Sequence, residues 1–224
     1  MGKLTKKKLL RLITPHFIAN DYTLFYGKNG IFSSLFVKRK EDLFLSVCMN
    51  IHRFYDDQFT ADLYLSTMTR FACTWGDIPK RCYTRPGWYL TEEELSKYLR
   101  DGNVFPDIWW DSSPESIEAF ISIFKIAEKR MFEDHELIEN IHKSKELVQL
   151  TNNTFSVIKA VEAHNQKENR LSLSNTGNVH LKPPECWYEE AELFWRNKKD
   201  NYSQMAIVDL AQDAYRMYVL TNQG

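Results

Sequence analysis

Glycine and proline are scarce in this chain, with 8 and 7 among 224 residues. Such a composition excludes a collagen-like architecture and argues against long flexible linkers. No apolar run approaches the roughly 20 residues that a bilayer-spanning helix needs, so we expect no association with a membrane. Neither sign of charge dominates, because 29 basic residues stand against 30 acidic ones. The chain therefore has no overall field that would draw it to nucleic acid or anionic lipid.

Cysteine is also sparse, and its spacing indicates no disulfide framework. Cys48, Cys73, Cys82 and Cys186 form no Cys-x-x-Cys pair, which is typical of a protein from a reducing compartment. Cys73 and Cys82 with His180 and Cys186 could assemble a zinc site. Neither pair has the two-residue spacing of a zinc ribbon or knuckle, so isolated structural thiols are the better interpretation.

Two other classes of motif are missing. The chain has neither a Gly-x-Ser-x-Gly elbow nor a glycine-rich phosphate loop, so we predict no catalytic residues and no cofactor. The N-terminus resembles a signal peptide only in part, because Arg11 interrupts the apolar pairs Leu9-Leu10 and Leu12-Ile13 and no small-residue cleavage site follows. We therefore expect a cytoplasmic protein.

What the chain does contain is a strand-rich first half. Apolar and polar residues alternate from Phe59 to Leu65, which is the period of a half-buried strand. Earlier apolar runs separated by short polar turns indicate an antiparallel meander. The predicted strands cover residues 22–26, 31–37, 43–49 and 59–65, after an amphipathic helix over residues 4–13 that ends near Pro15.

Helical periodicity dominates after residue 90. Thr91 and Glu94 have the spacing of a capping box, which predicts a short helix ending near Gly102. Ser113 and Pro114 suit an N-cap and a first helical turn, and they begin a long helix with a bend near residues 133–134. Its predicted buried stripe is Ile117, Phe120, Ile121, Phe124, Ala127 and Met131. Further helices are predicted over residues 154–164, 187–196 and 203–219, with a polar loop over residues 165–185.

These patterns predict an α+β fold. We expect an antiparallel sheet of about four strands covered by helices, with an all-helical C-terminal extension. Residues 1–150 would form the α+β core domain. Residues 151–224 would form a helical region packed on that core.

The stretch Asp107-Ile108-Trp109-Trp110-Asp111 is the most informative in the chain. Two adjacent tryptophans are costly to leave in water, and they stand where the strands give way to the long helix. We predict that one ring lies under the helix and that the other lines a groove. A shelf for a ligand is the alternative.

The segment from residue 80 to residue 89 is the strongest candidate for a binding element. Arginines interleaved with tyrosine and tryptophan can grip carboxylates or stack on bases, and these residue types are enriched at interface hot spots. The alternative is that the aromatic residues only pack this connection onto the sheet. The predicted partner-binding residues are Lys80, Arg81, Tyr83, Arg85, Trp88 and Tyr89, with Trp110 as a further anchor.

A second candidate is a helix face formed by His135, Glu139 and His142. Spacings of four and three residues place the three side chains on one face, and imidazole and carboxylate are good zinc ligands. The two histidines stand two turns apart, roughly 10 Å along the axis, which is too far to share one ion. A solvated polar face is the better interpretation, so we predict no metal site. The pair Asp56-Asp57 beside His52-Arg53 could act in catalysis but also suits a polar turn.

The order of these features resembles a group of uncharacterised bacterial domains of unknown function. The match consists of a basic N-terminal helix, a hairpin over Gly27–Val37, the strand Phe59–Leu65, the pair Trp109-Trp110 and a helix from Ile117, covering roughly the first 140 residues. The resemblance implies an α+β fold and no particular activity. Small bacterial domains of this kind often look like immunity or antitoxin proteins, which suggests a toxin as partner by analogy.

Three functions fit the sequence. The leading prediction is a non-enzymatic cytoplasmic protein that binds another protein, such as a toxin, and occludes it. The alternative is a metal-dependent hydrolase or nuclease that uses Glu139 with His135 or His142. The third is nucleic-acid binding through the lysines of the first helix and the arginines of residues 80–89, which the balanced net charge disfavours.

Overall fold

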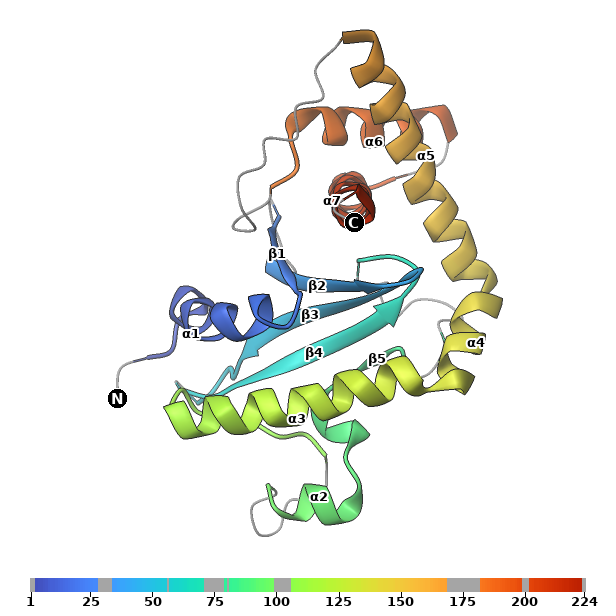
Figure 1. The fold of residues 1–224 in the computed structure, drawn as a ribbon. Helices are drawn as coiled ribbons and strands as arrows, with labels where there is room; N and C mark the ends of the chain where they lie inside the picture. The colour runs from blue at the N-terminus through green and yellow to red at the C-terminus, as the bar shows by residue number, and fades with distance from the viewer. Residues whose placement is uncertain are drawn as a thin grey trace.

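The computed structural model describes residues 3–27, 34–55, 57–70, 79, 81–98, 106–168, 182–198 and 202–222. These residues form an α+β fold, as predicted, with an antiparallel sheet and helices on both of its faces (Figure 1). The elements in chain order are α1 (Lys6–Ile18), β1 (Thr23–Tyr26), β2 (Ser34–Lys40), β3 (Leu43–Ile51), β4 (Phe59–Ser66), β5 (Tyr83–Thr84), η1 (Pro86–Tyr89), α2 (Glu92–Ser96), α3 (Pro114–Glu133), α4 (His135–Lys143), α5 (Lys145–Glu168), α6 (Glu185–Lys198) and α7 (Gln204–Asn222).

The sheet is a meander in which each strand pairs with the next, in the order β1-β2-β3-β4-β5. Lys40 lies opposite Leu43, so Glu41 and Asp42 alone turn the chain between β2 and β3. Glu41 has a φ of 57°, the left-handed conformation that tight hairpin turns use. The four predicted strands are confirmed, although the predicted turn at Gly27–Gly30 lies largely outside the described residues.

A fifth strand, β5, was not predicted. It has only two residues, and they lie opposite Leu63 and Tyr64 of β4. Two residues are too few to show a period of alternating hydrophobicity, which explains why the sequence indicates an irregular segment there. This short strand nevertheless matters, because it ties the predicted binding segment to the edge of the sheet.

Helices cover both faces of the sheet. On one face, Phe17 of α1 stacks on Phe36 with ring centroids 4.4 Å apart, and Phe120 of α3 meets Phe59 edge-on at 5.3 Å. On the other face, α7 approaches the sheet, as Figure 1 shows. Every residue of β4 is buried. The prediction of a half-buried β4 was therefore wrong, because Phe120 packs on Phe59 on one face and Arg85 pairs with Asp62 on the other.

The long helical arc follows the predicted start and bend but not every predicted length. Ser113 caps α3, and Asp134 ends α3 and caps α4 through a hydrogen bond from the Leu137 amide of 3.0 Å. The whole predicted stripe of α3 is buried. α1 continues through Pro15 to Ile18, and α5 begins at Lys145 rather than at residue 154. The predicted division at residue 150 falls inside α5.

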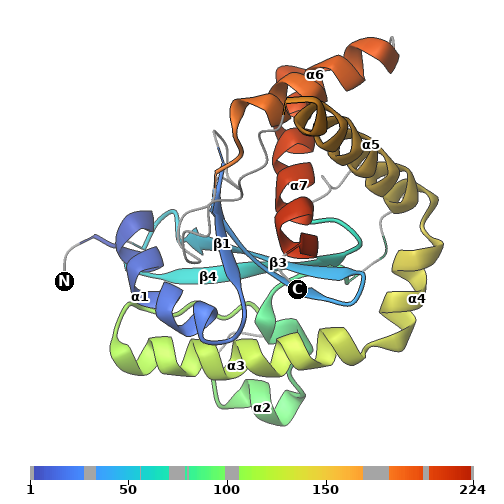
Figure 2. The ribbon, with the colours of Figure 1, turned by 45° about the horizontal axis from the view of Figure 1, so that its top comes forward.

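The C-terminal helices pack on the sheet and on one another. α7 contacts α5 and α6, and Figure 2 shows it lying between α5 and the sheet. Tyr215 of α7 meets Phe25 of β1 edge-on, with centroids 6.3 Å apart. Arg39 at the end of β2 donates to the carbonyl of Leu220 at 3.4 Å. Among the described helices, none has both the length and the apolar character that crossing a membrane requires.

Candidate binding pocket

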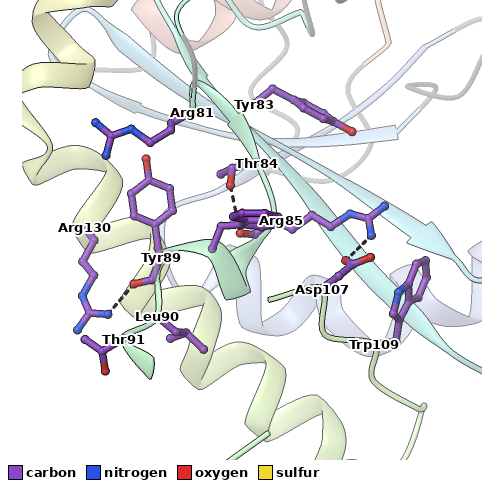
Figure 3. A pocket seen from close by; sticks show the side chains of 11 residues that line it. Arg81, Tyr83, Thr84, Arg85, Tyr89, Leu90, Thr91, Asp107, Trp109 and Arg130 are labelled. Atoms are coloured by element: carbon purple, nitrogen blue, oxygen red, sulfur yellow. Dashed lines mark hydrogen bonds and ion pairs between the residues drawn. The ribbon is translucent and has the colours of Figure 1, made fainter. Parts of the chain in front are cut away.

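A pocket of about 1050 Å³ opens beside β5, between η1 and the segment before α3 (Figure 3). Figure 3 shows Arg81, Tyr89 and Arg130 along one side of it and Tyr83, Asp107 and Trp109 along the other. The residues that line it are Arg81, Tyr83, Thr84, Arg85, Trp88, Tyr89, Leu90, Thr91, Asp107, Trp109 and Arg130. The predicted binding segment thus supplies much of the wall.

Gly87 allows η1 and the segment before α3, which form two walls of the pocket, to lie in close contact. A Cβ at this position would stand 2.0 Å from the carbonyl oxygen of Pro106, which is backbone and cannot move aside easily. Pro86 sits in the first turn of η1, where its missing amide hydrogen costs no hydrogen bond. The absence of a side chain at Gly87 therefore brings the segment carrying Asp107 and Trp109 against η1.

Arg85 is the centre of the pocket's polar network. Its Nε donates to Asp62 of β4 at 3.0 Å, and its Nη1 donates to Asp107. Asn50 of β3 donates to the other oxygen of Asp62 at 2.5 Å. The guanidinium also lies over the ring of Trp109, 5.2 Å from its centroid. Three contacts from two segments, β4 and the segment before α3, hold this arginine in one place, and Asn50 holds its partner Asp62.

Tyr83 stands beside the same carboxylate. Burial raises the pKa of the Tyr83 phenol to about 12, and the negative charge of Asp62 adds to the effect. The phenol is therefore neutral at physiological pH and serves as an uncharged polar edge. Nearly half of Tyr83 is nevertheless exposed, at 47%, so the ring remains available to a partner.

Arg130 of α3 holds the opposite wall of the pocket, which includes Tyr89 and Thr91, in place. It makes a bidentate pair with Glu94 at 2.6 and 2.9 Å, and it donates to the carbonyl oxygen of Tyr89 at 2.6 Å. Thr91 and Glu94 form the predicted capping box of α2, which is confirmed. The hydrogen bonds from Arg130, and then those from Thr91, lower the pKa of Glu94 to about 2. Glu94 therefore stays charged, and the wall stays fastened, at any physiological pH.

Arg81 holds the start of the segment to the corner between α3 and α4. Its guanidinium lies 3.1 Å from Asp134 and 3.4 Å from Glu136. Its backbone has a φ of 74°, a conformation that residues other than glycine rarely adopt. Such strain is typical of functional segments that their surroundings hold in place.

Exposed aromatic rings lie both in the pocket and next to it. Trp88 is 60% exposed. Trp109 meets His52 edge-on at 4.5 Å, and His52 lies 4.6 Å from Tyr55, which is 59% exposed. The Nδ1 atom of His52 accepts from the amides of Phe54 and Tyr55, both at 3.1 Å, and so shapes this loop. Large exposed rings held by ordered backbone are the usual anchors of protein interfaces.

One tryptophan of the pair is buried and the other lines the pocket, as the sequence predicts. The predicted anchor, Trp110, is however the buried one. Trp110 is 4% exposed, and its backbone pairs with Phe59 through hydrogen bonds of 2.7 and 2.9 Å. Trp109 is the ring that lines the pocket. In extended backbone, neighbouring side chains point to opposite faces, so Trp110 packs against Phe120 of α3 while Trp109 turns to the pocket. Lys80 lies outside the described residues.

The sequence interpretation gave no site role to three charged residues around the binding segment. Asp107 and Arg130 line the pocket, and Asp62 lies behind it, paired with Arg85. Asp62 could have been found, because it is a carboxylate in the middle of a predicted strand. Arg130 could not, because its partner Glu94 lies 36 residues away.

The metal-ligand candidates have other partners in the structure. His142 Nε2 lies 2.9 Å from Asp42, and Glu139 pairs with Lys143. In the described part of the chain no three His, Cys, Asp or Glu side chains are placed to hold a metal ion. Cys82 is buried and its thiol has a pKa of about 12, raised by burial. Cys73, His180 and Asp56 lie outside the described residues.

Two Ser-x-x-Lys spacings in the chain carry no catalytic geometry. Ser122 and Lys125 lie on α3, and Ser156 and Lys159 lie on α5, all with exposed side chains. Each serine hydroxyl donates to the backbone carbonyl four residues earlier, at 2.9 Å in both cases. This is the ordinary behaviour of serine on a helix surface.

Comparison of the chain with protein-family models, with curated proteins and with solved structures finds no match in any of the three. The resemblance of the first part of the chain to a bacterial domain family therefore stays a prediction. The function of the protein must therefore be inferred from the pocket and its surroundings.

Proposed function

We propose that this protein binds another protein through the pocket and the aromatic residues around it, and that it acts without catalysis by occluding its partner. The observation that carries the proposal is the combination of exposed Trp88 with a firmly held Arg85 on one surface. Tryptophan, tyrosine and arginine dominate interface hot spots. Because Arg85 is already held by Asp62, Asp107 and the ring of Trp109, little of its conformational entropy is lost on binding.

The backbone of the segment supports the same proposal. Arg81 and Arg130 tie its two ends to α3 and α4, and β5 ties its centre to β4. An interface built on such a segment presents one shape to its partner, which favours a specific complex. The specific class of partner that we propose is a toxin, which the protein would neutralise as immunity and antitoxin proteins do.

The test is quantitative capture of the partner from cells of the source organism. Trp88→Ala and Arg85→Ala should each weaken binding by about 2 kcal/mol. Leu193→Ala is the matched control, because Leu193 is an apolar residue on α6 that is 50% exposed, against 60% for Trp88, and it should leave binding unchanged. Thermal unfolding of each variant separates lost binding from lost folding. Unchanged affinity in both pocket variants would rule out this surface.

A further inference from the structure

The charges around the pocket do not balance. Each arginine of its wall is already ion-paired in the described structure: Arg81 with Asp134 and Glu136, Arg85 with Asp62 and Asp107, and Arg130 with Glu94. Three guanidinium groups therefore face five carboxylates. The arginines are neutralised by the protein itself, and negative charge remains in excess.

Part of that excess is accessible to a partner. The carboxylate of Asp107 is 38% exposed and that of Glu136 is 78% exposed. Glu92 and Glu93 follow Thr91 of the pocket wall on α2, and both are exposed, although Glu93 lies 3.9 Å from Lys97. The described ion-paired cluster around the pocket thus carries a formal excess of two negative charges, although Asp107 is the one carboxylate beside three arginines among the described residues that line it.

Aromatic rings stand beside these carboxylates. Trp88 and Tyr83 are 60% and 47% exposed, and a cation over the face of tryptophan or tyrosine is attracted to the ring's quadrupole. The pocket already contains one such contact, between Arg85 and Trp109 at 5.2 Å. Aromatic faces beside carboxylates are a suitable environment for an ammonium or guanidinium group.

We infer that the partner segment entering the pocket carries lysine or arginine side chains. This inference rests on the proposed function and specifies the chemistry of its partner. Exposed rings would stack on the partner's cations, and Asp107 and Glu136 would pair with them. An anionic partner, RNA included, would have to compete with carboxylates that already hold all three arginines.

The first experiment is selection from a random dodecapeptide library displayed on phage, with wild-type protein as bait. Clones are kept only if they fail to bind Trp88→Ala, so that every retained peptide depends on this surface. We expect retained peptides to be enriched in lysine and arginine relative to the unselected library. Trp88-dependent peptides without that enrichment would overturn the inference and leave the proposed function intact. A selection that yields no Trp88-dependent peptide would count against both.

The second experiment uses two charge changes of opposite sign, measured by fluorescence anisotropy with the most enriched peptide. Asp107→Asn should weaken binding about fivefold, whereas Arg81→Gln should strengthen it about twofold. Glu118→Gln is the control: it removes an exposed carboxylate of α3 about 18 Å along the helix from Arg130. Stronger peptide binding by Asp107→Asn together with weaker binding by Arg81→Gln would overturn the inference. Tight binding of a labelled 20-nucleotide RNA that Arg81→Gln weakens would overturn it as well.

Discussion

Two networks of arginine and aspartate join distant parts of this chain, and they differ chiefly in burial. The first lies under α7, where Asp213 accepts from the amide and hydroxyl of Thr69 at 2.8 and 2.6 Å and from the hydroxyl of Thr154 at 2.7 Å. Arg216 donates to the same Thr69 hydroxyl at 2.8 Å. The second is the pocket network of Arg85, which remains partly open to solvent.

The comparison shows how surroundings decide the role of the same chemical groups. Asp213 is fully buried, and burial lowers the pKa of Arg216 while the charge of Asp213 opposes that effect. A charge enclosed in this way must keep every partner it has, so it fixes the packing of α7 on the sheet. Arg85 and Asp107 can instead add contacts with a partner, because water still reaches them. The first network therefore maintains the fold, and we propose that the second recognises the partner.

The largest predicted effect is on the buried network. Asp213→Ala leaves the buried amide and hydroxyl of Thr69 without their acceptor and Arg216 without its counter-charge, whereas Thr154 keeps its hydrogen bond to the Leu150 carbonyl. We expect a loss of about 3–5 kcal/mol in the free energy of unfolding, measured by urea denaturation. A loss below about 1 kcal/mol would show that α7 is held by apolar packing alone.

Gly87→Ala tests how the pocket is assembled. Because the added methyl group would meet the Pro106 carbonyl oxygen at 2.0 Å, the segment with Asp107 and Trp109 must move away from η1. We expect a loss of about 1–3 kcal/mol in stability, with shifted indole signals of Trp88 and Trp109 in NMR spectra. Unchanged spectra would mean that the two walls do not depend on this close contact.

Trp88→Ala gives the sharpest contrast with Asp213→Ala. Trp88 is largely exposed, so its removal should change the stability by no more than about 0.5 kcal/mol while binding is weakened as proposed above. The measurement is urea denaturation beside the binding assay, on the same preparation. A large loss of stability would assign Trp88 to the fold and remove it from the proposed interface.

The smallest predicted effect is the acid titration of Glu94. Its folded pKa of about 2 lies below the usual value of 4.5, so the stabilising contribution of the carboxylate is complete above the unfolded pKa. That contribution is lost only as the pH falls from the unfolded pKa through the folded one. Carboxyl ¹³C NMR should show a midpoint near 2 in the wild type and a midpoint raised toward 4.5 in Arg130→Gln, where the hydrogen bonds from Thr91 remain. A wild-type midpoint near 4.5 would mean that Arg130 does not hold this wall.

Local features of the fold could be predicted from the sequence. The capping box at Thr91, the N-cap at Ser113 and the bend at Asp134 each depend on neighbouring residues. The start of α5 at Lys145 was missed because Asn152 and Asn153 interrupt its apolar pattern. A local signal was nevertheless present, since Ser144 accepts a hydrogen bond from the Leu147 amide at 3.3 Å, as an N-cap does.

The candidate site could be predicted only in part. Its aromatic and basic segment is visible because residue types alone suggest it, and five of its predicted residues line the pocket. Its charge balance is not visible, because Asp62 and Arg130 reach the pocket from β4 and α3. The sequence therefore suggests a basic surface, whereas in the folded arrangement each of the three arginines is paired with at least one carboxylate.

The most direct test of the proposed function is photo-crosslinking in cells of the source organism. A photoreactive phenylalanine analogue replaces Trp88 in one strain and Leu193, at a similarly exposed position on α6, in another. We predict a discrete crosslinked protein partner from position 88 and none from position 193. No crosslink at position 88, or the same product from both positions, would contradict the proposal that this pocket is the interface.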